Sequence, residues 1–515
     1  GVSGETIHND GIHDGAHHEL LSALGEWRGF SAIVVGDYML DQLLYGDAER
    51  LSADAPVPVL DVRRQESRAG GAANVCLDLV ALGGSVRAFG VVGEDAESAL
   101  LRAALEDGGI DVGGLVADAA RPTTVKRSLV GLAQARHPQK MFRVDMESRE
   151  PVPAAVRARL LDAFERALAG ADVVCLEDYG KGVCDELLCR GVIDIARRAG
   201  VPVLVDPAAR EDFTRYRGAT AITPNRTEAE RATGRTPGGA LGGTPGRASG
   251  HVGAMAQRML EDLELEAVVL TLDKDGSLLL ERGGGPVSVP TVAREVYDVT
   301  GAGDMMLAGL AAARANGIGW AASVELANAA AGLEVEQFGV VPIPIERVHA
   351  EVLGMHQRDR GRVRTPDELR VELAAVRSIG KRVVFTNGCF DLLHVGHAAL
   401  LERARELGDY LVVGLNTDSS VRRLKGEGRP VNGQDDRAAL LSALRAVDAV
   451  VLFGEDTPSR LIEAVRPDVL VKGADYAGRE VVGASFVESI GGRVELVELV
   501  PDRSTSALLG SIRPG

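Results

Sequence analysis

The sequence predicts an α/β protein of two successive domains. Its 515 residues exceed what one domain of typical size holds. Apolar runs with the pattern of strands alternate with segments of helical periodicity, once from Ser31 onward and again after residue 368. Between the two series, residues 357–365 are charged and show no apolar periodicity. We therefore predict four segments: a leader over 1–24, a first domain over 25–348, a linker over 349–368 and a second domain over 369–515.

Composition and charge narrow the class of protein. Apolar residues make up 45% of the chain and charged residues 25%, as in ordinary soluble proteins. The net charge of −17 argues against non-specific binding to nucleic acid or membranes. No uninterrupted apolar run approaches the ~20 residues that span a bilayer. The five cysteines form no C-x-x-C pair, which is typical of reduced thiols in a cytoplasmic protein.

Two segments read as unstructured. The first 18 residues are rich in Gly, His and Asp and lack the apolar core of a signal peptide, so we predict a disordered leader. Its histidines could bind a metal adventitiously, but a solvated tail is the simpler interpretation. Residues 234–250 are rich in Gly, Pro, Ser and Thr, and this predicts a mobile surface insertion.

The first domain begins with a strand over 32–35 that ends in Gly36-Asp37, where a carboxylate would lie at the carboxyl edge of a sheet. Residues 51–62 are extended and contain proline, which suits edge or lid strands. Gly70 and Gly71 precede a helix over 75–82, so the backbone there can approach a ligand closely, and Asn74 can bind hydroxyls. A tight turn with a cap explains the same residues equally well. Further strands are predicted over 86–92, 123–130, 140–144, 173–176, 203–206 and 268–272.

The strongest signal in this half is Gly301-Ala302-Gly303-Asp304, which enters a long Ala-rich helix. Backbone N–H groups at a helix N-terminus would form an anion hole for a phosphoryl group in transfer. Asp304 is then placed to accept a proton from an attacking hydroxyl. The alternative is a glycine turn with an aspartate near a helix start.

Taken in order, Gly36-Asp37, Gly70 to Asn74, Asn225-x-x-Glu228 and Thr300 to Asp304 resemble the ribokinase (PfkB) carbohydrate kinases, over roughly residues 25–345. The resemblance implies a doubly wound sheet with a small β lid, ATP with Mg²⁺, and a K⁺ or other monovalent cation near the anion hole. It also implies site residues: for the sugar, Asp37, Gly70, Gly71 and Asn74; for the nucleotide, Asn225, Arg226, Thr227, Glu228, Gly301, Ala302 and Gly303; for the cations, Glu228 (Mg²⁺) and Asp298 (monovalent); and as the base, Asp304. Residues 273–276 (DKDG) depart from the neutral glycine loop common in the family, and we assign them no role.

The second domain opens with a capping box over 365–368 that starts a helix, followed by a strand over 382–385. An Asn387-Gly388 turn then leads to a helix from about His397, with His394 and His397 at its N-terminus. This end of a helix binds phosphate, and Gly396 lets a phosphate approach the backbone. Histidines at a helix start can be capping or packing residues, but the H-x-G-H spacing directly after a strand favours function.

Further elements complete a second α/β series. We predict strands over 410–415, 449–453 and 469–471, a basic glycine loop over 424–430, and a helix over 434–444 with Arg437 on its polar side. Residues 502–506 open a last helix, and their hydroxyl and N–H groups suit the β- and γ-phosphates of a nucleoside triphosphate. An ordinary Ser/Thr N-cap is the alternative.

The stretch 385–397 resembles the nucleotidyltransferase superfamily that includes cytidylyltransferases and phosphopantetheine adenylyltransferase, and this implies a Rossmann-like domain. The implied reaction transfers a nucleotidyl group from a nucleoside triphosphate to a phosphate and releases pyrophosphate. By resemblance, His394 and His397 stabilise the α-phosphate, and Lys425 and Arg503 offset phosphate charge. The other implied nucleotide-binding residues are Asn387, Phe390, Asn416, Asp418, Ser504, Thr505 and Ser506, with Lys472 as a weaker candidate.

A kinase of the first type followed by a transferase of the second resembles the bifunctional enzymes that make nucleotide-activated heptose for lipopolysaccharide and related surface glycans. Residues 36–41, 55–59 and 471–476 add to this likeness. It implies ATP-dependent phosphorylation of D-glycero-β-D-manno-heptose 7-phosphate at O1, then adenylyl transfer from ATP to heptose 1-phosphate. A separate phosphatase would act between the steps, and Arg143 and Lys181 would bind the 7-phosphate. Exposed lid strands would pair in a homodimer.

Three alternatives stay open. The same two reactions can act on another sugar or use another nucleoside triphosphate. One half can be a non-catalytic binding module, although the intact Asp304, His394 and His397 argue against it. The chain can also be a cofactor enzyme of the flavin or coenzyme A type.

Overall fold

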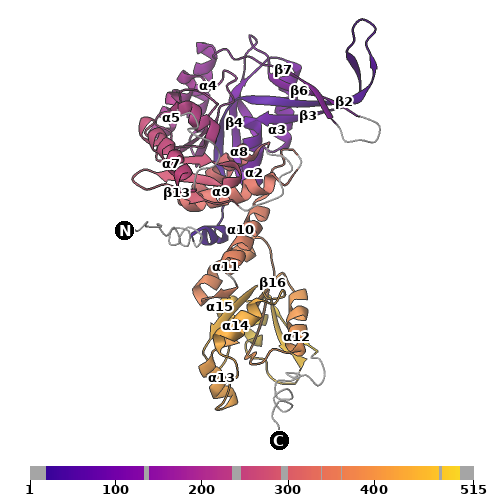
Figure 1. Ribbon diagram of the computed structural model, residues 1–515, viewed down its shortest axis with the longest axis vertical. Coiled ribbons are helices and arrows are strands. Elements are labelled where there is room, and N and C mark those ends of the chain that lie inside the picture. The colour runs from indigo at the N-terminus through magenta and orange to yellow at the C-terminus, as the bar shows by residue number, and fades with distance from the viewer. Residues whose placement is uncertain are drawn as a thin grey trace. The chain divides into compact units, whose positions relative to one another are not determined.

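The computed structural model describes residues 19–132, 139–234, 245–291, 300–337, 339–360, 362–474 and 478–498, without the side chains of 245–250, 274 and 356–360. Figure 1 shows the chain by residue number. The described residues divide into two compact units. Unit 1 comprises Arg28–Val348, and unit 2 comprises residues 349–498 together with residues 19–27 near the N-terminus.

Unit 1 alternates strands and helices over most of its length. Its elements are β1 (Phe30–Gly36), β2 (Tyr38–Leu51), β3 (Pro58–Gly71), α2 (Ala72–Ala81), β4 (Gly84–Val92), α3 (Ala96–Asp107), β5 (Asp111–Ala117), β6 (Thr124–Gly131), β7 (Gln139–Met146), α4 (Ala154–Ala167), β8 (Val173–Glu177), α5 (Glu186–Arg198), β9 (Val203–Asp206), η1 (Thr214–Tyr216), β10 (Ala221–Ile222), α6 (Arg226–Thr233), α7 (Pro245–Asp262), β11 (Ala267–Thr271), η2 (Asp273–Asp275), β12 (Ser277–Glu281), β13 (Val287–Val289), α8 (Ala302–Ala315), α9 (Trp320–Glu334) and the start of α10 (Ile345–Arg360), whose larger part, from His349 on, belongs to unit 2.

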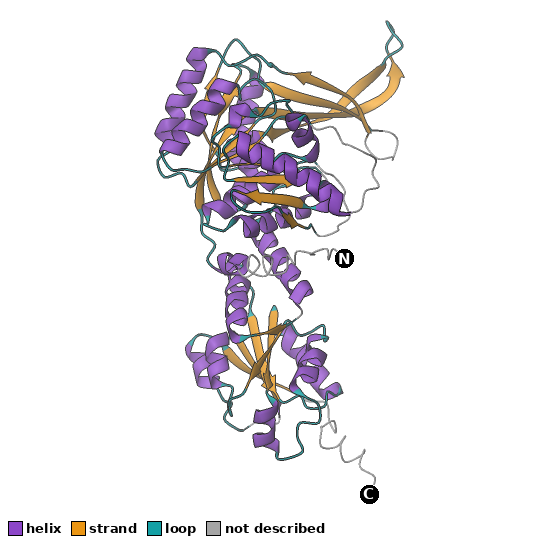
Figure 2. Cartoon of the chain, turned by 60° about the vertical axis from the view of Figure 1, so that its left-hand side comes forward, coloured by secondary structure: helices purple, strands orange, loops and turns teal. Residues whose placement is uncertain are grey.

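The main sheet of unit 1 has nine strands in the order β13-β12-β11-β10-β9-β8-β1-β4-β5. Its strands from β11 to β5 are parallel, and β12 and β13 extend it antiparallel. Helices cover this sheet, as Figure 2 shows. The chain order reverses at β1, which pairs with both β4 and β8, and this is the kind of switch point at which open α/β sheets bind ligands. The predicted doubly wound fold is confirmed.

A second sheet of four strands, in the order β3-β2-β6-β7, forms the predicted lid. The long β2 and β3 pair antiparallel as a hairpin that projects from the rest of unit 1 (Figure 1). Alternation gives β7 two different faces. Phe142, Val144 and Met146 on one face are 66%, 47% and 41% exposed, whereas Arg143 and Asp145 lie on the other.

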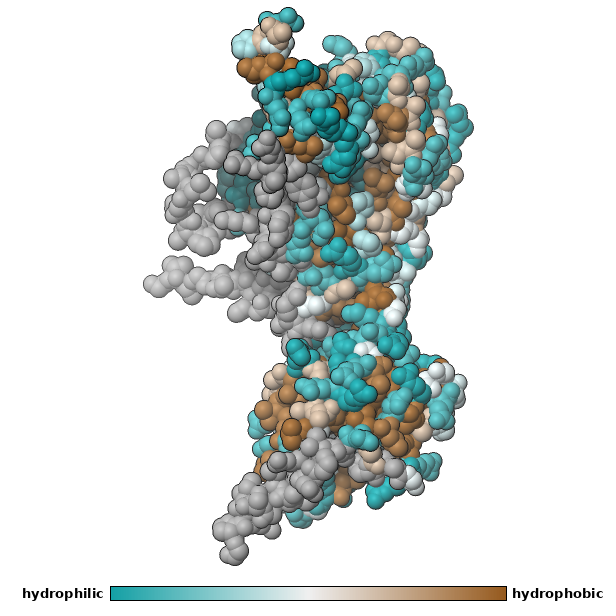
Figure 3. Space-filling model, turned by 90° about the vertical axis from the view of Figure 1, so that its right-hand side faces the viewer, coloured by the Kyte–Doolittle hydropathy of each residue, from teal (hydrophilic) through white to brown (hydrophobic). Residues whose placement is uncertain are grey.

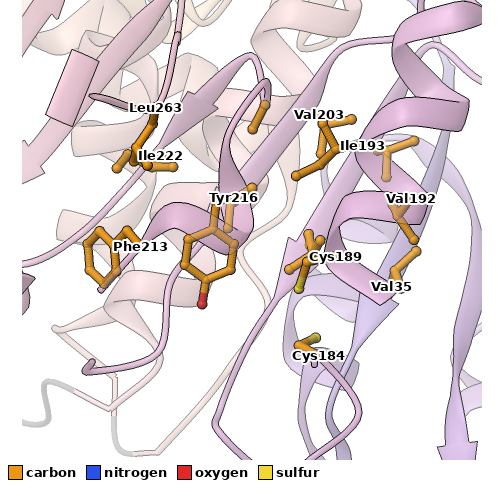
Figure 4. Close-up of a cluster of buried hydrophobic side chains, with 14 of the residues drawn as sticks. Val35, Cys184, Cys189, Val192, Ile193, Val203, Phe213, Tyr216, Ile222 and Leu263 are labelled. Carbon is orange, nitrogen blue, oxygen red and sulfur yellow. The ribbon is translucent and has the colours of Figure 1, made fainter. Parts of the chain in front are cut away.

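The core of unit 1 packs α4, α5 and α7 against the sheet through Val, Leu, Ile and Phe side chains. Figure 4 shows part of this cluster, with Phe213 and Tyr216 side by side and their ring centroids 5.7 Å apart. Buried Cys184 and Cys189 belong to the same cluster, and all five cysteines are free. The sequence-based expectation of reduced thiols agrees with this packing.

Unit 2 repeats the α/β alternation around one parallel sheet. Its elements after α10 are β14 (Val363–Arg364), α11 (Pro366–Ser378), β15 (Val383–Gly388), α12 (Val395–Glu406), β16 (Tyr410–Asn416), α13 (Asp418–Lys425), α14 (Gln434–Ser442), β17 (Ala449–Phe453), α15 (Ser459–Val465), β18 (Val469–Gly473), α16 (Ala484–Ser489) and β19 (Arg493–Val497). The strand order is β14-β17-β16-β15-β18-β19, so the order reverses at β15.

The start of α11 follows from its sequence. Thr365 caps the helix, the Glu368 carboxylate accepts a hydrogen bond from the Thr365 backbone N–H, and Pro366 occupies the first turn, as predicted. Deeper in the unit, Glu372 is fully buried between two partners. It pairs with Arg364 and accepts a hydrogen bond of 2.6 Å from the Tyr410 hydroxyl. Burial of this carboxylate is therefore compensated by charge and hydrogen bonding.

The predicted disordered leader is wrong for its last part, because residues 19–25 are helical and belong to unit 2. Leu20, Leu21 and Leu24 are between 0% and 2% exposed. A Cβ on Gly25 would lie 2.8 Å from the Cβ of Ala374 on α11, so the two helices are in close contact. These three leucines form an apolar stripe, and its burial stabilises a helix in a segment whose composition predicted a disordered tail.

Trp27 and His349 mark where the chain leaves unit 2 and returns to it. Their rings meet edge to face, with centroids 5.5 Å apart. Two further predictions need correction here. Residues 245–250, at the end of the predicted mobile insertion, begin α7, and the predicted linker 349–368 is largely occupied by α10 and the start of α11.

Within the described residues, no helix combines the length and the apolarity needed to cross a membrane. Figure 3 shows hydrophobic residues interspersed with hydrophilic ones over the face that it presents.

The leucine stripe leads to a testable prediction. Leu24→Ala should lower the free energy of unfolding of unit 2 by about 2–5 kcal/mol, because it removes a buried side chain and leaves a cavity. Differential scanning calorimetry of the full chain measures this change. Ser22→Ala is the matched control, since Ser22 is exposed on the same helix. Equal melting profiles for the two variants would contradict the assignment of this helix to unit 2.

Candidate functional sites

The first candidate site lies at the carboxyl ends of the central strands of unit 1. In register, Gly36 pairs with Glu177 and Glu177 pairs with Asp206, so three neighbouring strands end side by side. The N-terminus of α8 lies at the same edge: a Cβ built on Gly303 would lie 3.8 Å from an Asp206 carboxylate oxygen. The sheet thereby gathers residues that are far apart in the sequence.

Asp304 sits in the first turn of α8 and is 5% exposed. One carboxylate oxygen accepts a hydrogen bond of 2.8 Å from the Asn74 amide. The other accepts a hydrogen bond of 2.7 Å from the Tyr179 hydroxyl. Burial raises the pKa of Asp304, and these two donors act in the opposite direction. Two residues predicted from separate motifs, Asn74 and Asp304, thus meet directly.

The loop before α8 has the conformation that an anion hole needs. Gly301 caps the helix in the left-handed region with φ of 94°. A Cβ there would lie 2.6 Å from a Glu334 carboxylate oxygen, so only glycine fits without displacing that side chain. The first N–H groups of α8, including those of Ala302 and Gly303, have no intrahelical acceptor and can bind a phosphoryl oxygen.

The carboxylate of Asp37, a predicted sugar ligand, is hydrogen-bonded to backbone groups of the protein. Its carboxylate accepts three backbone N–H groups, from Tyr179 at 2.9 Å, Lys181 at 3.0 Å and Val183 at 3.2 Å, and it is 1% exposed. Burial, and then the charge of Asp178, raises the pKa of Asp37 to about 6. The structure therefore gives Asp37 the role of organising the loop after β8.

Asp41 is a site residue that the sequence analysis left out. It lies on β2, and a Cβ on Gly70 would come within 2.5 Å of its carboxylate, so Gly70 is needed for this approach. One Asp41 oxygen is buried and has no hydrogen-bond partner among the described residues. Burial raises the pKa of Asp41, and the nearby Lys126, Lys140 and Arg143 lower it. The only sequence feature that could have indicated Asp41 is its place five residues after Gly36.

The other predicted sugar and nucleotide residues are placed as follows. Arg143 is paired with Asp145, and Lys181 is paired with Glu147, so both cations already have a carboxylate partner. Asn225 caps α6, and the Glu228 carboxylate accepts a hydrogen bond from the Asn225 backbone N–H. Arg226 pairs with Asp275 at 3.4 Å, Thr227 is exposed, and Gly71 has φ of 61° next to the Asp37 carbonyl. The structure does not bring Asn225 to Thr227 into contact with Asp304.

Three carboxylates offer a fit for a divalent cation. One oxygen each from Glu177, Asp206 and Asp304 lie within 4.8 Å of one another. An oxygen of Glu177 is buried without a hydrogen-bond partner among the described residues. Oxygen-only ligands of this charge suit Mg²⁺. Glu228, the predicted Mg²⁺ ligand, lies near Asp206 but is engaged in its helix cap.

Five predicted site residues fall outside the described residues. These are Asp298, Arg503, Ser504, Thr505 and Ser506.

The second candidate site lies at the carboxyl end of β15. His394 caps α12 and its Nδ1 accepts a hydrogen bond of 3.2 Å from the Gly396 N–H. The His394 and His397 rings stack with centroids 3.8 Å apart, and Phe390 packs 5.1 Å from His397. Phe390 itself has a positive φ of 44° and is 4% exposed, so the turn holds it in place as a wall of the site.

The electrostatics of this site favour the neutral form of both histidines. Burial lowers the pKa of His397 to about 4, and the charges of His394 and Lys425 act in the same direction. Burial also lowers the pKa of His394. Lys425 ends α13 and is exposed, so it can approach an incoming anion. Lys472 donates a hydrogen bond of 2.6 Å to the Asn387 side chain and orients it beside the strand end.

Arg437 was predicted on the polar side of its helix, and this prediction is wrong. The side chain is fully buried and donates to the backbone oxygens of Asn432, Cys389 and Asn416 and to the Asp418 carboxylate at 2.6 Å. It thereby ties two predicted nucleotide residues, Asn416 and Asp418, to the turn that carries H-x-G-H. A single arginine in a helix gives no sequence signal for such a role.

Two family models match the chain, one in each half. The family model of the pfkB family carbohydrate kinases matches residues 31–346, and the cytidylyltransferase-like model matches residues 385–500. A solved structure, phosphofructokinase-2 from Escherichia coli in complex with potassium, covers 63% of this chain and 99% of its own at a TM-score of 0.51 and 17% identity. At that identity the likeness concerns the fold alone.

Curated relatives are similar over nearly the whole chain. The bifunctional protein HldE of Geobacter sulfurreducens is 46% identical over 482 residues, which cover 94% of this chain and 95% of the relative. The protein of the same name from Geobacter metallireducens is 44% identical over 485 residues, which cover 94% and 96%.

The buried histidines of unit 2 predict how its stability depends on pH. Burial lowers the pKa of both His349 and His397 to about 4, whereas an unfolded histidine titrates near ~6.5. Between these values the unfolded chain binds more protons, so the free energy of unfolding should fall as the pH falls from about 6.5 to about 4.

His349→Gln isolates one of these protons, because His349 lies outside the candidate active site. The variant should show a slope of stability against pH that is smaller by about one proton. Denaturant unfolding at stepped pH values measures this slope. An unchanged slope would show that His349 titrates normally in the folded protein.

Proposed function

The chain belongs to the family of the bifunctional protein HldE, and we propose that it carries out two ATP-dependent steps on one sugar. Unit 1 phosphorylates D-glycero-β-D-manno-heptose 7-phosphate at O1 and gives the 1,7-bisphosphate. Unit 2 transfers an adenylyl group from ATP to heptose 1-phosphate and gives ADP-heptose and pyrophosphate. The observation that carries the proposal is the presence, in one chain, of a buried carboxylate at a glycine-capped helix start and an H-x-G-H helix N-terminus.

In the kinase step, Asp304 accepts the proton of the C1 hydroxyl while that oxygen attacks the γ-phosphorus of ATP. The bond between the γ-phosphorus and the bridging oxygen breaks, and ADP leaves. The N–H groups at the start of α8 stabilise the phosphoryl group during transfer. Asn74 contacts the base, and the Asp41 charge acts on it from β2, where Gly70 lies against the Asp41 carboxylate. These residues support a sugar seated between the main sheet and the lid.

Mg²⁺ would be held by Glu177 and Asp206 at this edge of the sheet, where it would neutralise phosphate charge. We propose this pair in place of Glu228. The expectation of K⁺ near Asp298 still rests on the family resemblance alone.

In the transferase step, the sugar 1-phosphate attacks the α-phosphorus of ATP directly, and pyrophosphate leaves. His394 and His397 lie at a helix N-terminus, where N–H groups and the helix dipole favour the developing charge. Lys425 adds a positive charge near His397. No covalent intermediate is needed, since a phosphate is itself the nucleophile.

Partners follow from this chemistry. A pathway phosphatase would remove the 7-phosphate between the two steps. Arg143 and Lys181 could bind that phosphate only by replacing Asp145 and Glu147 as partners. The exposed apolar face of β7 supports a homodimer formed through the lid. The use of ATP in both steps supports a cytoplasmic location.

Mass spectrometry of the products tests the proposal. Heptose 7-phosphate and ATP should give the 1,7-bisphosphate alone, and ADP-heptose should appear only after a phosphatase is added. Parallel reactions with other sugar phosphates and other nucleoside triphosphates test the closest alternative. Turnover of riboflavin or pantetheine compounds, with none of any sugar phosphate, would overturn the proposal in favour of a cofactor enzyme.

Two variants should separate the activities. Asp304→Asn should lower the kinase kcat by about 10²–10⁴-fold, because the amide cannot accept the proton, and should leave the transferase unchanged. His397→Asn should have the opposite pattern. Each variant is the control for the other, measured in the full chain with separate kinase and transferase assays. Kinase activity that survives Asp304→Asn would remove Asp304 as the base.

A further inference from the structure

Tyr179 is the side chain in the kinase site that the proposed mechanism does not yet use. It follows β8 by two residues, and the sequence alone assigned it no role. Resting on the kinase function proposed above, we propose that Tyr179 is a positioning residue for phosphoryl transfer. Its hydroxyl fixes the orientation of the Asp304 carboxylate, and its backbone N–H ties that orientation to Asp37.

The geometry at Asp304 supports this role. A carboxylate can turn about its last side-chain bond, so one hydrogen bond does not fix its plane. Asn74 on α2 holds one oxygen at 2.8 Å, and Tyr179 holds the other at 2.7 Å from a different element. Each oxygen can accept a further hydrogen bond, and this leaves room for the hydroxyl of the sugar. The two donors therefore preset the base without blocking it.

Tyr179 is itself held by two contacts besides its hydrogen bond to Asp304. Its backbone N–H donates to Asp37 at 2.9 Å, at the end of β1. The ammonium of Lys126, from the lid strand β6, lies 5.3 Å from the centre of the Tyr179 ring, at a distance typical of a cation–π contact. The hydroxyl of a tyrosine is a hydrogen-bond donor at neutral pH, so it can hold the Asp304 carboxylate at 2.7 Å. A side chain fixed this way can pass its position on to the base.

The loop after Tyr179 is built to keep this arrangement. Gly180 and Gly182 both have positive φ, 69° and 87°. A Cβ on Gly182 would lie 2.2 Å from the Glu150 carbonyl oxygen, so no other residue fits there. Lys181 and Val183 donate their N–H groups to the same Asp37 carboxylate as Tyr179 does. The contacts connect Asp37, the loop, Tyr179 and Asp304 in one continuous series.

The matched control is Tyr216. Its hydroxyl donates to a carboxylate of the same region, Asp178, at 2.6 Å, and the residue is fully buried. It does not contact Asp304. Tyr216→Phe therefore removes a similar hydrogen bond from the same loop and leaves the two donors of the base in place.

The test is steady-state kinetics of Tyr179→Phe and Tyr216→Phe in the full chain, beside the unaltered protein. For Tyr179→Phe we expect the kinase kcat to fall roughly 10- to 100-fold, since loss of alignment at the reacting centre acts on turnover, with the sugar KM within about threefold. For Tyr216→Phe both constants should stay within about threefold. The transferase rate of each variant is the internal control and should not change.

Other outcomes would overturn the inference. An unchanged kcat in Tyr179→Phe would show that Asn74 alone suffices. A raised sugar KM with unchanged kcat would make Tyr179 a substrate contact. Equal losses in both variants, or a lowered melting temperature of unit 1 in Tyr179→Phe, would make the hydroxyl a structural group. If the unaltered protein phosphorylates no sugar, the proposed function fails, and the result is distinct from all of these.

Discussion

The kinase site depends on one buried carboxylate, that of Asp37. Asp37 directly follows β1, and three backbone N–H groups of the loop after β8 donate hydrogen bonds to its carboxylate. A buried carboxylate without such donors would be too costly to keep, and a loop without such an acceptor would have orphaned N–H groups. Each compensates the other, and together they fix where Tyr179 stands. Asp304, the proposed base at the start of α8, accepts a hydrogen bond from the Tyr179 hydroxyl, so the geometry of the candidate site is tied to a folding requirement.

Much of this site could be predicted because its parts lie in short motifs. Gly301 to Asp304 and Gly70 to Asn74 carry their chemistry in adjacent residues, and the α/β alternation places strand ends at one edge. Asp41, Tyr179 and the Glu177–Asp206 pair could not be predicted, because their contacts are with residues of neighbouring strands that are distant in the sequence. Which strands are neighbours is set by sheet order, and a single sequence does not contain that order. For Asp37 the motif is visible, but its three backbone donors come from the loop after another strand and could not be predicted; its contact with the sugar stays a prediction.

In unit 2, too, features set by neighbouring residues in the sequence could be predicted, and features set by distant contacts could not. The capping box at Thr365 and the H-x-G-H helix start were readable, since both are local rules of helix termini. The burial of Arg437 could not be predicted, because charged residues are usually exposed. Only the buried acceptors that surround its side chain explain its position. The helix over 19–25 was missed because its leucine stripe is short and its partner, α11, lies much later in the chain.

The contact between Trp27 and His349 bears on how the chain reaches its native state. Unit 2 is discontinuous in sequence, and all of unit 1 lies between its two parts. Closing so long a loop from an open chain carries a large entropic cost. If unit 1 folds first, it brings residues 28 and 348 to a fixed separation, and the remaining loop is short. During synthesis, the leucine stripe would then stay uncovered until α11 emerges, and over that interval its apolar surface is open to non-native association.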